Sequence, residues 1–280
     1  MVNNFEIGGK KIGNGYPTFV IAELSANHAN DFDIAVETIK AMKDAGADAV
    51  KFQTYSPDTI TIDCDKEDFQ IKQGTIWDGQ VLYNLYEEAY MPWEWQPKLK
   101  EIAEELGLIV FSSPFDFTSV DFLEDMDVPA YKIASYEITD IPLIKYVASK
   151  GKPIIISTGI ATIDDIELAL KTCYDVGNNQ VSLLKCTSSY PSPLDEINLK
   201  TIQDMDERFD AVIGLSDHTM GISVSIAAVA LGANIIEKHF ILDRNMDSAD
   251  AEFSMEPHEF KMMVDGIRNV EKALGNVNYD

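Results

Sequence analysis

The residues of this sequence best suited to chemistry are polar groups that directly follow apolar runs. His218 and His239 both do so, in "GLSDH" and "IIEKH". Two imidazoles, completed by a carboxylate and by water, form an open site suited to a divalent ion such as Mn²⁺, Fe²⁺, Co²⁺ or Zn²⁺. Glu23, which ends the run "TFVIAE", is a candidate for that carboxylate or for a base that acts through bound water. Either histidine alone would indicate a hydrogen-bonded structural residue, but the pair with the acid favours a metal site.

Lysines inside apolar runs are a second feature, because a buried ammonium group is costly without a partner. Segments that resemble strands contain Lys51, Lys132, Lys185 and Lys238. One such lysine would be salt-bridged or would reach out to solvent. Several of them, mixed with serine and threonine hydroxyls, predict an anion pocket that suits phosphate. Alternate residues of a barrel strand face opposite sides, so not all of these lysines need to enter the pocket.

These side chains recur because the chain repeats one unit, an apolar strand followed by an amphipathic helix and a glycine or proline turn. The predicted strands are 18–24, 49–53, 108–114, 130–135, 153–158, 181–187, 211–217 and 235–240. The predicted helices are 32–45, 94–106, 118–125, 140–150, 162–176, 196–206, 221–231 and 257–273. This repeat predicts an α/β fold, a (β/α)8 TIM barrel, with its active site at the carboxyl ends of the strands. An open doubly wound sheet is the alternative, but no dinucleotide-binding glycine pattern follows the first strand.

Two segments fall outside the repeat. The stretch "IGGKKIG" within residues 1–16 predicts a short N-terminal β-hairpin ahead of the barrel. Residues 54–93 form a long excursion after the second strand, of the kind that shapes an active site. The aromatic residues of 76–95 are expected to serve local packing more than to form a substrate wall. No linker divides the chain, so residues 1–280 are expected to form a single barrel domain.

Composition limits the classes of binding partner and the cellular compartment that fit this chain. A formal net charge of −25 argues against nucleic acid and anionic membranes, because both are polyanions. No apolar run approaches the roughly 20 residues that span a bilayer, and the first residues lack the apolar core of a signal peptide. Three widely spaced cysteines predict neither a disulfide framework nor a cysteine-based zinc site, which favours the reducing cytoplasm.

The residues alone indicate a metal-dependent barrel enzyme that acts on a phosphorylated substrate. Aldol-type carbon–carbon chemistry fits, since a metal can polarise an aldehyde while lysines hold the phosphate. A Schiff-base aldolase with Lys132 or Lys185 as nucleophile is the nearest alternative, although that mechanism needs no histidine pair. The alternative outside enzymology is a non-catalytic barrel that binds sugar or serves as a dimerising scaffold.

The sequence resembles the sialic acid synthase family, in order and across nearly the whole chain, in the motifs "IAELSANHAN", "AGADAVKFQTY", "FSSPFD", "YKIASYE", "IISTG", "LLKCTSSYP", "GLSDHTMG" and "IIEKHF". Two features resemble the pseudaminic acid synthase branch. One is "AELSANH", where the sialic acid branch more usually has Glu-Ile-Gly-x-Asn-His. The other is the excursion "DKEDFQIKQGTIWDGQVLYNLYEEAYMPWEW".

The resemblance implies condensation of phosphoenolpyruvate with an open-chain N-acetylated amino sugar, which yields a nine-carbon 2-keto acid and phosphate. In the pseudaminic branch the sugar is 2,4-diacetamido-2,4,6-trideoxy-L-altrose. Synthesis of N-acetylneuraminate or legionaminate is the alternative within the family. The resemblance also implies a homodimer and a divalent metal, commonly Mn²⁺, with Mg²⁺ or Co²⁺ as the other candidates.

Roles follow from the resemblance residue by residue. The implied metal ligands are His218 and His239. The residues implied in catalysis are Glu23, Lys51, Lys132 and Glu137. The implied phosphoenolpyruvate pocket contains the same two lysines with Ser135, Ser157 and Ser216. The positions implied around the metal and the sugar are Gln53, Glu137, Ser188, Tyr190 and Asp250. At Asp250 the family often has Gly-Pro-Asp, whereas this chain has Ser248-Ala249-Asp250, and Asn27 and His28 match the strongest motif without an assignable role.

Members of the family usually continue into a small antifreeze-like C-terminal domain that covers the partner's barrel in a swapped dimer. This sequence stops soon after its last predicted barrel helix. The expectation is therefore that the chain binds phosphoenolpyruvate and metal, while its turnover of the sugar is weak or absent.

Overall fold

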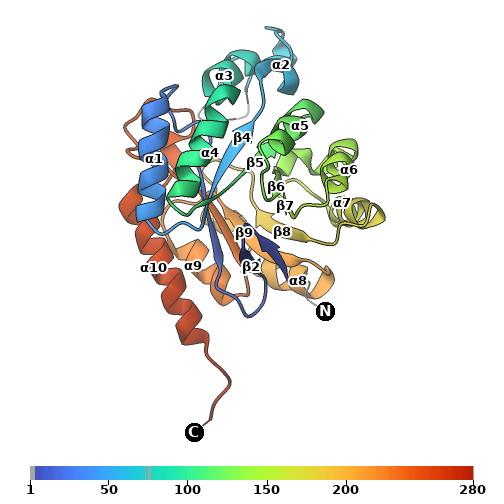
Figure 1. The fold of residues 1–280 in the computed structure, drawn as a ribbon, viewed down its shortest axis with the longest axis vertical. Coiled ribbons are helices and arrows are strands. Elements are labelled where there is room, and N and C mark those ends of the chain that lie inside the picture. The colour runs from blue at the N-terminus through green and yellow to red at the C-terminus, as the bar shows by residue number, and fades with distance from the viewer. Residues whose placement is uncertain (1–3, 73, 75–76, 280) are drawn as a thin grey trace.

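A closed barrel of parallel strands forms the centre of the molecule (Figure 1). The computed structural model describes residues 4–72, 74 and 77–279. Around the barrel the strands follow the order β3-β4-β5-β6-β7-β8-β9, and β10 closes the ring against β3. Each barrel strand is followed by at least one helix. The predicted (β/α)8 barrel is confirmed, and the open sheet is excluded.

The elements agree with the predicted bounds to within about two residues almost everywhere. The barrel strands are β3 (Phe19–Glu23), β4 (Ala49–Thr54), β5 (Ile109–Pro114), β6 (Tyr131–Ile133), β7 (Ile154–Ser157), β8 (Val181–Cys186), β9 (Val212–Asp217) and β10 (Ile235–His239). The α-helices are α1 (Phe32–Asp44), α2 (Pro57–Ile60), α3 (Leu82–Ala89), α4 (Gln96–Glu105), α5 (Phe117–Asp125), α6 (Ile141–Ser149), α7 (Ile163–Asp175), α8 (Thr201–Arg208), α9 (Ser223–Ala230) and α10 (Pro257–Leu274). The 3-10 turns are η1 (Glu67–Phe69), η2 (Trp93–Trp95), η3 (Ser135–Thr139), η4 (Leu194–Glu196) and η5 (Ala251–Phe253).

The start of α8 is the exception. The helix predicted at 196–206 begins only at Thr201. The residues after Pro193 form the turn η4 instead, and Asn198 has φ of 49°, in the left-handed region that interrupts an α-helix.

Helix caps and left-handed turns set where each strand begins. The Thr162 hydroxyl accepts the N–H of Asp165 at the start of α7, and the Asp165 carboxylate accepts the N–H of Thr162 in return. Just after α1, Gly46 has φ of 91°, a conformation that costs glycine little and turns the chain towards β4. The strand that follows pairs with β3 so that Lys51 lies opposite Glu23.

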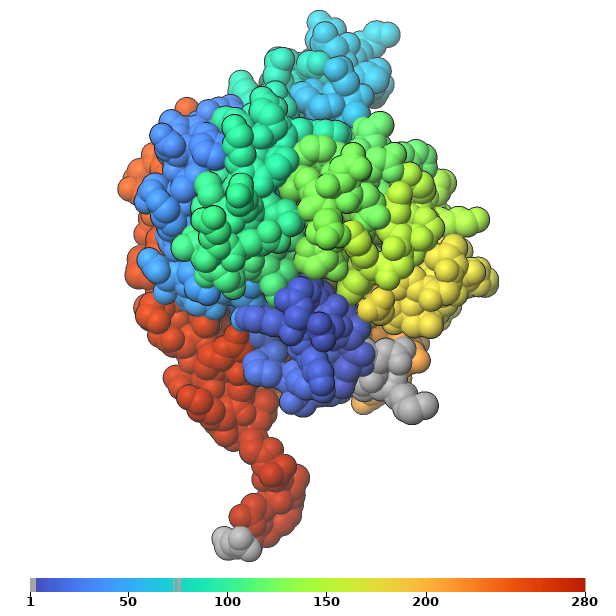
Figure 2. All heavy atoms as spheres, viewed as in Figure 1, coloured from blue at the N-terminus to red at the C-terminus, as the bar shows by residue number. Residues whose placement is uncertain are grey.

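The amino-terminal end of the barrel is covered by the predicted hairpin, β1 (Phe5–Ile7) and β2 (Lys10–Ile12). Its Ile7 and Ile12 side chains are buried, and its outer face forms the dark blue surface in Figure 2. Lys10 of the hairpin and Arg268 of α10 both pair with Asp48, which precedes β4. Because this end is filled, substrates must reach the barrel from the opposite end, where the strands finish.

The excursion predicted at 54–93 contains α2, η1, α3 and the start of η2, and its residues 73, 75 and 76 lie outside the described part of the chain. Two tryptophans of the 76–95 stretch, Trp93 and Trp95, pack locally, as expected. Trp95 lies edge-on to Phe32 at a ring distance of 5.7 Å, and Trp93 lies 4.8 Å from Phe122. This packing anchors the excursion to α1 and α5.

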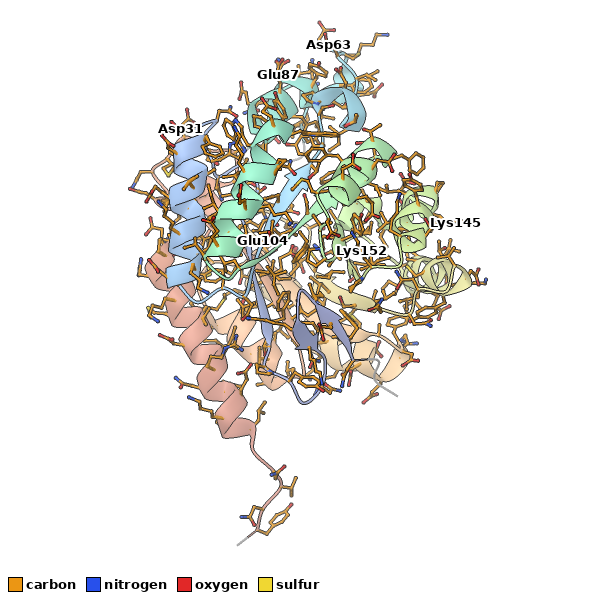
Figure 3. All side chains as sticks on the ribbon, in the orientation of Figure 1. Asp31, Asp63, Glu87, Glu104, Lys145 and Lys152 are labelled. Carbon is orange, nitrogen blue, oxygen red and sulfur yellow. The ribbon has the colours of Figure 1, made fainter. Side chains whose placement is uncertain are left out.

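The acidic charge lies on the outside of the molecule. Asp63 and Glu87 of the excursion and Glu104 of α4 are exposed, and Figure 3 shows Asp63 and Glu87 at the upper edge of the molecule. None of the helices in the described residues is both long enough and apolar enough to cross a membrane.

Candidate active site

Four charged side chains form a buried network at the carboxyl ends of the strands. Lys51 Nζ lies 2.5 Å from Glu23 Oε2 and 3.4 Å from Glu237 Oε1. Lys132 Nζ lies 3.0 Å from the same Glu237 oxygen. In the strand register Glu23 is opposite Lys51 on one side and His239 on the other. The barrel thus brings the lysines predicted on β4 and β6 together, with Glu237 between them.

The two carboxylates of this network have opposite pKa shifts. Burial would raise the pKa of Glu237, but the Lys132 and Lys51 ammonium groups outweigh that effect and lower the pKa to about 2. For Glu23, burial prevails over the attraction of Lys51 and raises the pKa to about 7. Glu237 is therefore the fixed counter-ion of the lysines, whereas Glu23 can exchange a proton near neutral pH, as a general acid or base must.

Serine hydroxyls surround the lysines. Ser216 Oγ donates to Glu237 Oε1 at 3.5 Å, and Ser135 Oγ accepts the N–H of Gly159 at 3.1 Å. A Cβ at Gly159 would lie only 2.1 Å from Ser188 Oγ, so glycine is required where these hydroxyls converge. Buried oxygens with no hydrogen-bond partner within the described residues include Ser157 Oγ, Ser188 Oγ and Glu137 Oε2. Such atoms are rare in folded proteins, which indicates that a ligand completes their hydrogen bonds.

The two predicted histidines converge from neighbouring strands. The ring centroids of His218 and His239 are 5.4 Å apart. His218 Nδ1 lies 3.0 Å from the Thr187 carbonyl oxygen, which can only accept, so Nδ1 carries a hydrogen and Nε2 is the nitrogen left to bind a metal. Burial would lower the pKa of His218, but the neighbouring Cys186 side chain outweighs that effect and raises it. Burial lowers the pKa of His239 well below its ordinary value, which keeps that ring neutral. Neutral imidazole is the form that binds a metal ion.

These residues fit a divalent metal ion. His218 is oriented by a backbone carbonyl, as metal-binding histidines usually are. Asp250 Oδ2 lies 3.5 Å from His239 Nδ1, so a carboxylate is also close. Within the described residues, no three histidine, cysteine or acidic side chains are already grouped as a metal cage. His218 and His239 would hold the ion, with Asp250 nearby, and a bound divalent ion would supply Lewis-acid chemistry.

Aromatic rings form one wall beside the histidines. Tyr190 lies 4.4 Å from the His218 ring, and Phe253 lies 4.9 Å from the His239 ring. Trp77 of the excursion lies 5.8 Å from Tyr190 and 6.3 Å from Phe253. The expectation of local packing is wrong for Trp77, because the excursion carries this ring over the mouth of the barrel.

Gln53 and Asp250 join the site through Ser25. Gln53 Nε2 donates to Glu23 Oε1 at 3.1 Å and to Ser25 Oγ at 2.9 Å. The Ser25 hydroxyl in turn donates to Asp250 Oδ2, which faces His239. A chain of hydrogen bonds therefore runs from the Glu23 carboxyl to Asp250, whose Oδ2 lies 3.5 Å from His239 Nδ1.

Two of the four lysines considered for the anion pocket do not enter it. Lys238 Nζ lies 2.8 Å from Asp217 Oδ2, and both side chains are fully buried outside the barrel lumen. Lys185 is opposite Leu215 in the register, whereas the next position along β9, Ser216, faces inward. The pocket thus contains two lysines rather than four, because strand residues alternate between its two faces.

Asn27 and His28, which had no assignable role, hold the loop between β3 and α1. Asn27 Nδ2 donates to the Phe240 carbonyl oxygen at 2.9 Å, which ties the loop to the end of β10. His28 Nδ1 accepts the N–H of Asn30 at 3.1 Å, and its ring lies edge-on to Trp95 at 5.8 Å. Burial lowers the pKa of His28 to about 4. His28 is thus a neutral packing residue, away from the histidine pair.

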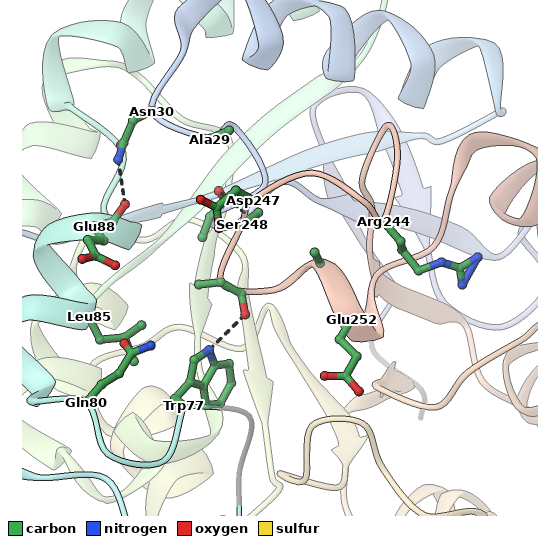
Figure 4. A pocket seen from close by; sticks show the side chains of 13 residues that line it. Ala29, Asn30, Trp77, Gln80, Leu85, Glu88, Arg244, Asp247, Ser248 and Glu252 are labelled. Carbon is green, nitrogen blue, oxygen red and sulfur yellow. Dashed lines mark hydrogen bonds between the residues drawn. The ribbon is translucent and has the colours of Figure 1, made fainter.

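A pocket of about 660 Å³ lies beside this centre (Figure 4). Trp77 forms part of its wall and donates from Nε1 to the Ala249 carbonyl oxygen at 3.0 Å. Its charged lining residues are Glu88, Arg244, Asp247 and Glu252. Carboxylates outnumber cations there, so a phosphate is better accommodated by the lysine and serine centre than by this pocket.

Comparison with known proteins identifies the family. The NeuB family model matches residues 38–279. This chain belongs to the NeuB family. A relative, the pseudaminic acid synthase of Campylobacter jejuni, is 48% identical over 262 residues, which cover 94% of this chain and 76% of the relative. The N,N'-diacetyllegionaminic acid synthase of the same organism is 39% identical, covering 92% and 78% of the two chains. The solved N-acetylneuraminic acid synthetase of Leptospira borgpetersenii has a TM-score of 0.90 at 32% identity and covers 100% and 93% of the two chains.

Three residues of this NeuB-type site were not assigned from the sequence. Glu237 was visible there as a strand-end acid, and its position two residues before His239 places it on the same inward face. Gly159 and Ser25 gave no comparable signal. Their roles depend on how closely two loops approach and on a backbone angle, which residue types do not reveal.

Proposed function

We propose that this NeuB-family chain is a phosphoenolpyruvate-dependent synthase of nine-carbon 2-keto sugar acids, with pseudaminic acid as its product. The observation that carries the proposal is the meeting of Lys51 and Lys132 with buried hydroxyls beside the imidazoles of His218 and His239. Lysines and hydroxyls suit a phosphate, and the imidazoles suit a metal. The identity of 48% to a pseudaminic acid synthase, against 39% to a legionaminic acid synthase, supports the branch.

In the proposed reaction, carbon 3 of phosphoenolpyruvate forms a bond to the aldehyde carbon of open-chain 2,4-diacetamido-2,4,6-trideoxy-L-altrose. The oxygen of a water molecule bonds to carbon 2, and phosphate leaves as its bond to carbon 2 breaks. A divalent ion, Mn²⁺ in this proposal, would polarise the aldehyde when held by His218 and His239. Lys51 and Lys132 hold the phosphate, and Glu23 moves a proton to or from water or the sugar oxygen.

The remaining residues line the two substrates in this proposal. Those assigned to phosphoenolpyruvate are Ser135, Ser157 and Ser216. Those assigned to the sugar and the metal surroundings are Gln53, Glu137, Ser188, Tyr190 and Asp250. We place the enzyme in the reducing cytoplasm, which the free state of Cys64, Cys173 and Cys186 supports, and we propose a homodimer by family resemblance.

A Schiff-base aldolase is disfavoured by the surroundings of its two candidate lysines. Burial lowers the pKa of Lys132, but its Nζ is held by Glu237 at 3.0 Å, and a Schiff-base mechanism would leave the histidine pair without a role. Lys185 lies on the face of β8 that points away from the lumen.

The proposal is tested by the metal dependence of phosphate release from phosphoenolpyruvate plus the sugar. Chelation should abolish the release, and added Mn²⁺ should restore it. His218→Ala should lower the rate by at least about 100-fold, because even residues behind a metal ligand contribute that much. His258→Ala is the matched control, since the His258 side chain is 69% exposed on α10.

Phosphate release that survives chelation or His218→Ala would contradict the metal-dependent mechanism. A lysine adduct trapped by borohydride would favour the Schiff-base aldolase instead.

A further inference from the structure

Ser25 has an unfavourable backbone conformation beside the catalytic centre. It follows Glu23 by two residues, its φ is 46°, and it is only 5% exposed. For a residue with a Cβ, this left-handed conformation is sterically unfavourable. Strain of this kind in a buried loop persists where the side chain or the loop geometry has a function.

The hydroxyl of Ser25 makes both of its hydrogen bonds to residues of the site. It accepts from Gln53 Nε2 at 2.9 Å and donates to Asp250 Oδ2. Gln53 comes from β4, whereas Asp250 comes from the segment between β10 and η5. A glycine would suit the backbone better and would leave both partners without this hydroxyl. The serine therefore contributes to the arrangement of the site rather than to the stability of its loop.

The two hydrogen bonds decide what Gln53 and Asp250 can offer a substrate. Both N–H groups of the Gln53 amide are used, one by Glu23 Oε1 and one by Ser25 Oγ, so the amide presents its carbonyl oxygen. Asp250 is oriented with Oδ2 towards Ser25 and His239. The Gln53 amide can then act only as an acceptor towards a substrate, and the ionised Asp250 carboxylate also accepts. Acceptors match the hydroxyl and acetamido N–H groups of an amino sugar, and phosphoenolpyruvate in its ionised form has no such donors.

We propose that Ser25 is a positioning residue for the amino sugar, because its hydroxyl fixes the Gln53 carbonyl and the Asp250 carboxylate as a pair of acceptors. This inference rests on the proposed function and adds to it the device that orients the second substrate.

The test is Ser25→Gly, which removes the hydroxyl and relieves the backbone strain, so the fold should be retained or stabilised. The kcat/KM for the sugar should fall about tenfold, while the Kd for phosphoenolpyruvate, measured by calorimetry, should stay within about twofold of wild type. Asp127→Gly is the matched control. Asp127 also has a left-handed φ, 50°, but its side chain is 93% exposed after α5, at the opposite end of the barrel.

A double-mutant cycle with Asp250→Asn identifies the route of the effect. If Ser25 acts through Asp250, Ser25→Gly should cost much less in the Asp250→Asn background than in wild type. The proposal would be overturned if Ser25→Gly kept wild-type kinetics for the sugar, or if it lost sugar binding and phosphoenolpyruvate binding equally. Additive effects of the two substitutions in the cycle would also overturn it. If no sugar makes the wild-type protein release phosphate from phosphoenolpyruvate, the proposed function itself fails, and the role of Ser25 fails with it.

Discussion

Glu23 and Glu237 are both buried carboxylates at the mouth of the barrel, yet their pKa values shift in opposite directions. Glu237 Oε1 lies within 3.4 Å of the ammonium groups of both Lys51 and Lys132, whereas Glu23 has an ion pair with Lys51 alone. Two close cations outweigh the cost of burying Glu237, whereas burial and the negative charge of Glu237 outweigh the attraction of Lys51 at Glu23. Glu23 is therefore the member of the network whose proton can move during catalysis.

The rate of condensation should depend on pH through Glu23, whose pKa is about 7. If ionised Glu23 is the base, kcat/KM should fall about tenfold for each pH unit below about 7 and stay level above it. Glu23→Gln cannot ionise, so kcat/KM should fall by about 100-fold or more, and the decline on the acid side should disappear. Phosphate release measured between about pH 5 and about pH 9 checks both expectations.

Glu137 provides the control, because burial also raises its pKa to about 7. Glu137→Gln should retain the decline on the acid side even if its overall rate is lower. A decline that persists in Glu23→Gln and is lost in Glu137→Gln would show that the titrating proton belongs to Glu137.

At the scale of single residues, the sequence predicts which side chains could do chemistry better than it predicts the strand face from which they point. The apolar runs that contain Lys51, Lys132, Lys185 and Lys238 look alike in sequence. Yet the side chains of Lys51 and Lys132 face the lumen, whereas those of Lys185 and Lys238 face the helices. Strands as short as β6 leave the phase of the alternation undetermined from sequence, because three residues contain little periodicity. The role of Ser25 depends on a φ angle that its residue type does not predict.

Among the elements, the loop between β3 and α1 links three parts of the mouth. Asn27 binds the Phe240 carbonyl at the end of β10, and Asn30 Nδ2 donates to the Glu88 carbonyl of α3 at 2.9 Å. His28 lies between these contacts and packs on Trp95. The loop therefore holds the excursion in place, and the strongest sequence motif includes structural residues as well as the catalytic acid.

Acid should weaken the protein through His28, whose pKa is about 4 when folded and about 6.5 when unfolded. Between these values the unfolded chain binds more protons, so stability is full above about pH 6.5 and falls as pH decreases towards about 4, by about 3 kcal/mol. His28→Asn does not titrate and keeps an oxygen to accept the Asn30 N–H. Its stability should therefore change less over this interval, as measured by urea unfolding at a series of pH values.

His258→Asn is the control for this experiment, since it removes an exposed histidine of α10. It should leave the acid dependence of stability as in wild type. The same acid dependence in wild type and in His28→Asn would contradict the assignment of a neutral, buried His28.

Elements were predictable where local chemistry marks them. The capping pair Thr162 and Asp165 and the glycine after α1 locate helix ends to within a residue or two. The start of α8 was not, because asparagine tolerates the left-handed conformation that Asn198 adopts here but does not require it. Trp77 is a similar case, since only the folded excursion shows that it reaches Tyr190.

Across the whole molecule, charge is separated between the surface and the mouth. The chain has a formal net charge of −25, yet Lys51 and Lys132 are nearly fully buried at the centre. The hairpin fills the amino-terminal end, so these cations are reached from the carboxyl end of the strands. The fold itself was predictable because the strand–helix unit recurs along the chain, and closure of the barrel follows from that repetition.

The central claim is that this site joins phosphoenolpyruvate to the sugar of the pseudaminic branch, and a substrate panel tests it most directly. The protein would be supplied with Mn²⁺, phosphoenolpyruvate and one sugar at a time: 2,4-diacetamido-2,4,6-trideoxy-L-altrose, N-acetylmannosamine or the legionaminate precursor. Released phosphate and the mass of the product would be measured together. The altrose derivative should give the highest kcat/KM, with one phosphate released per nine-carbon acid. A clear preference for either other sugar, or no phosphate release with any of them, would contradict it.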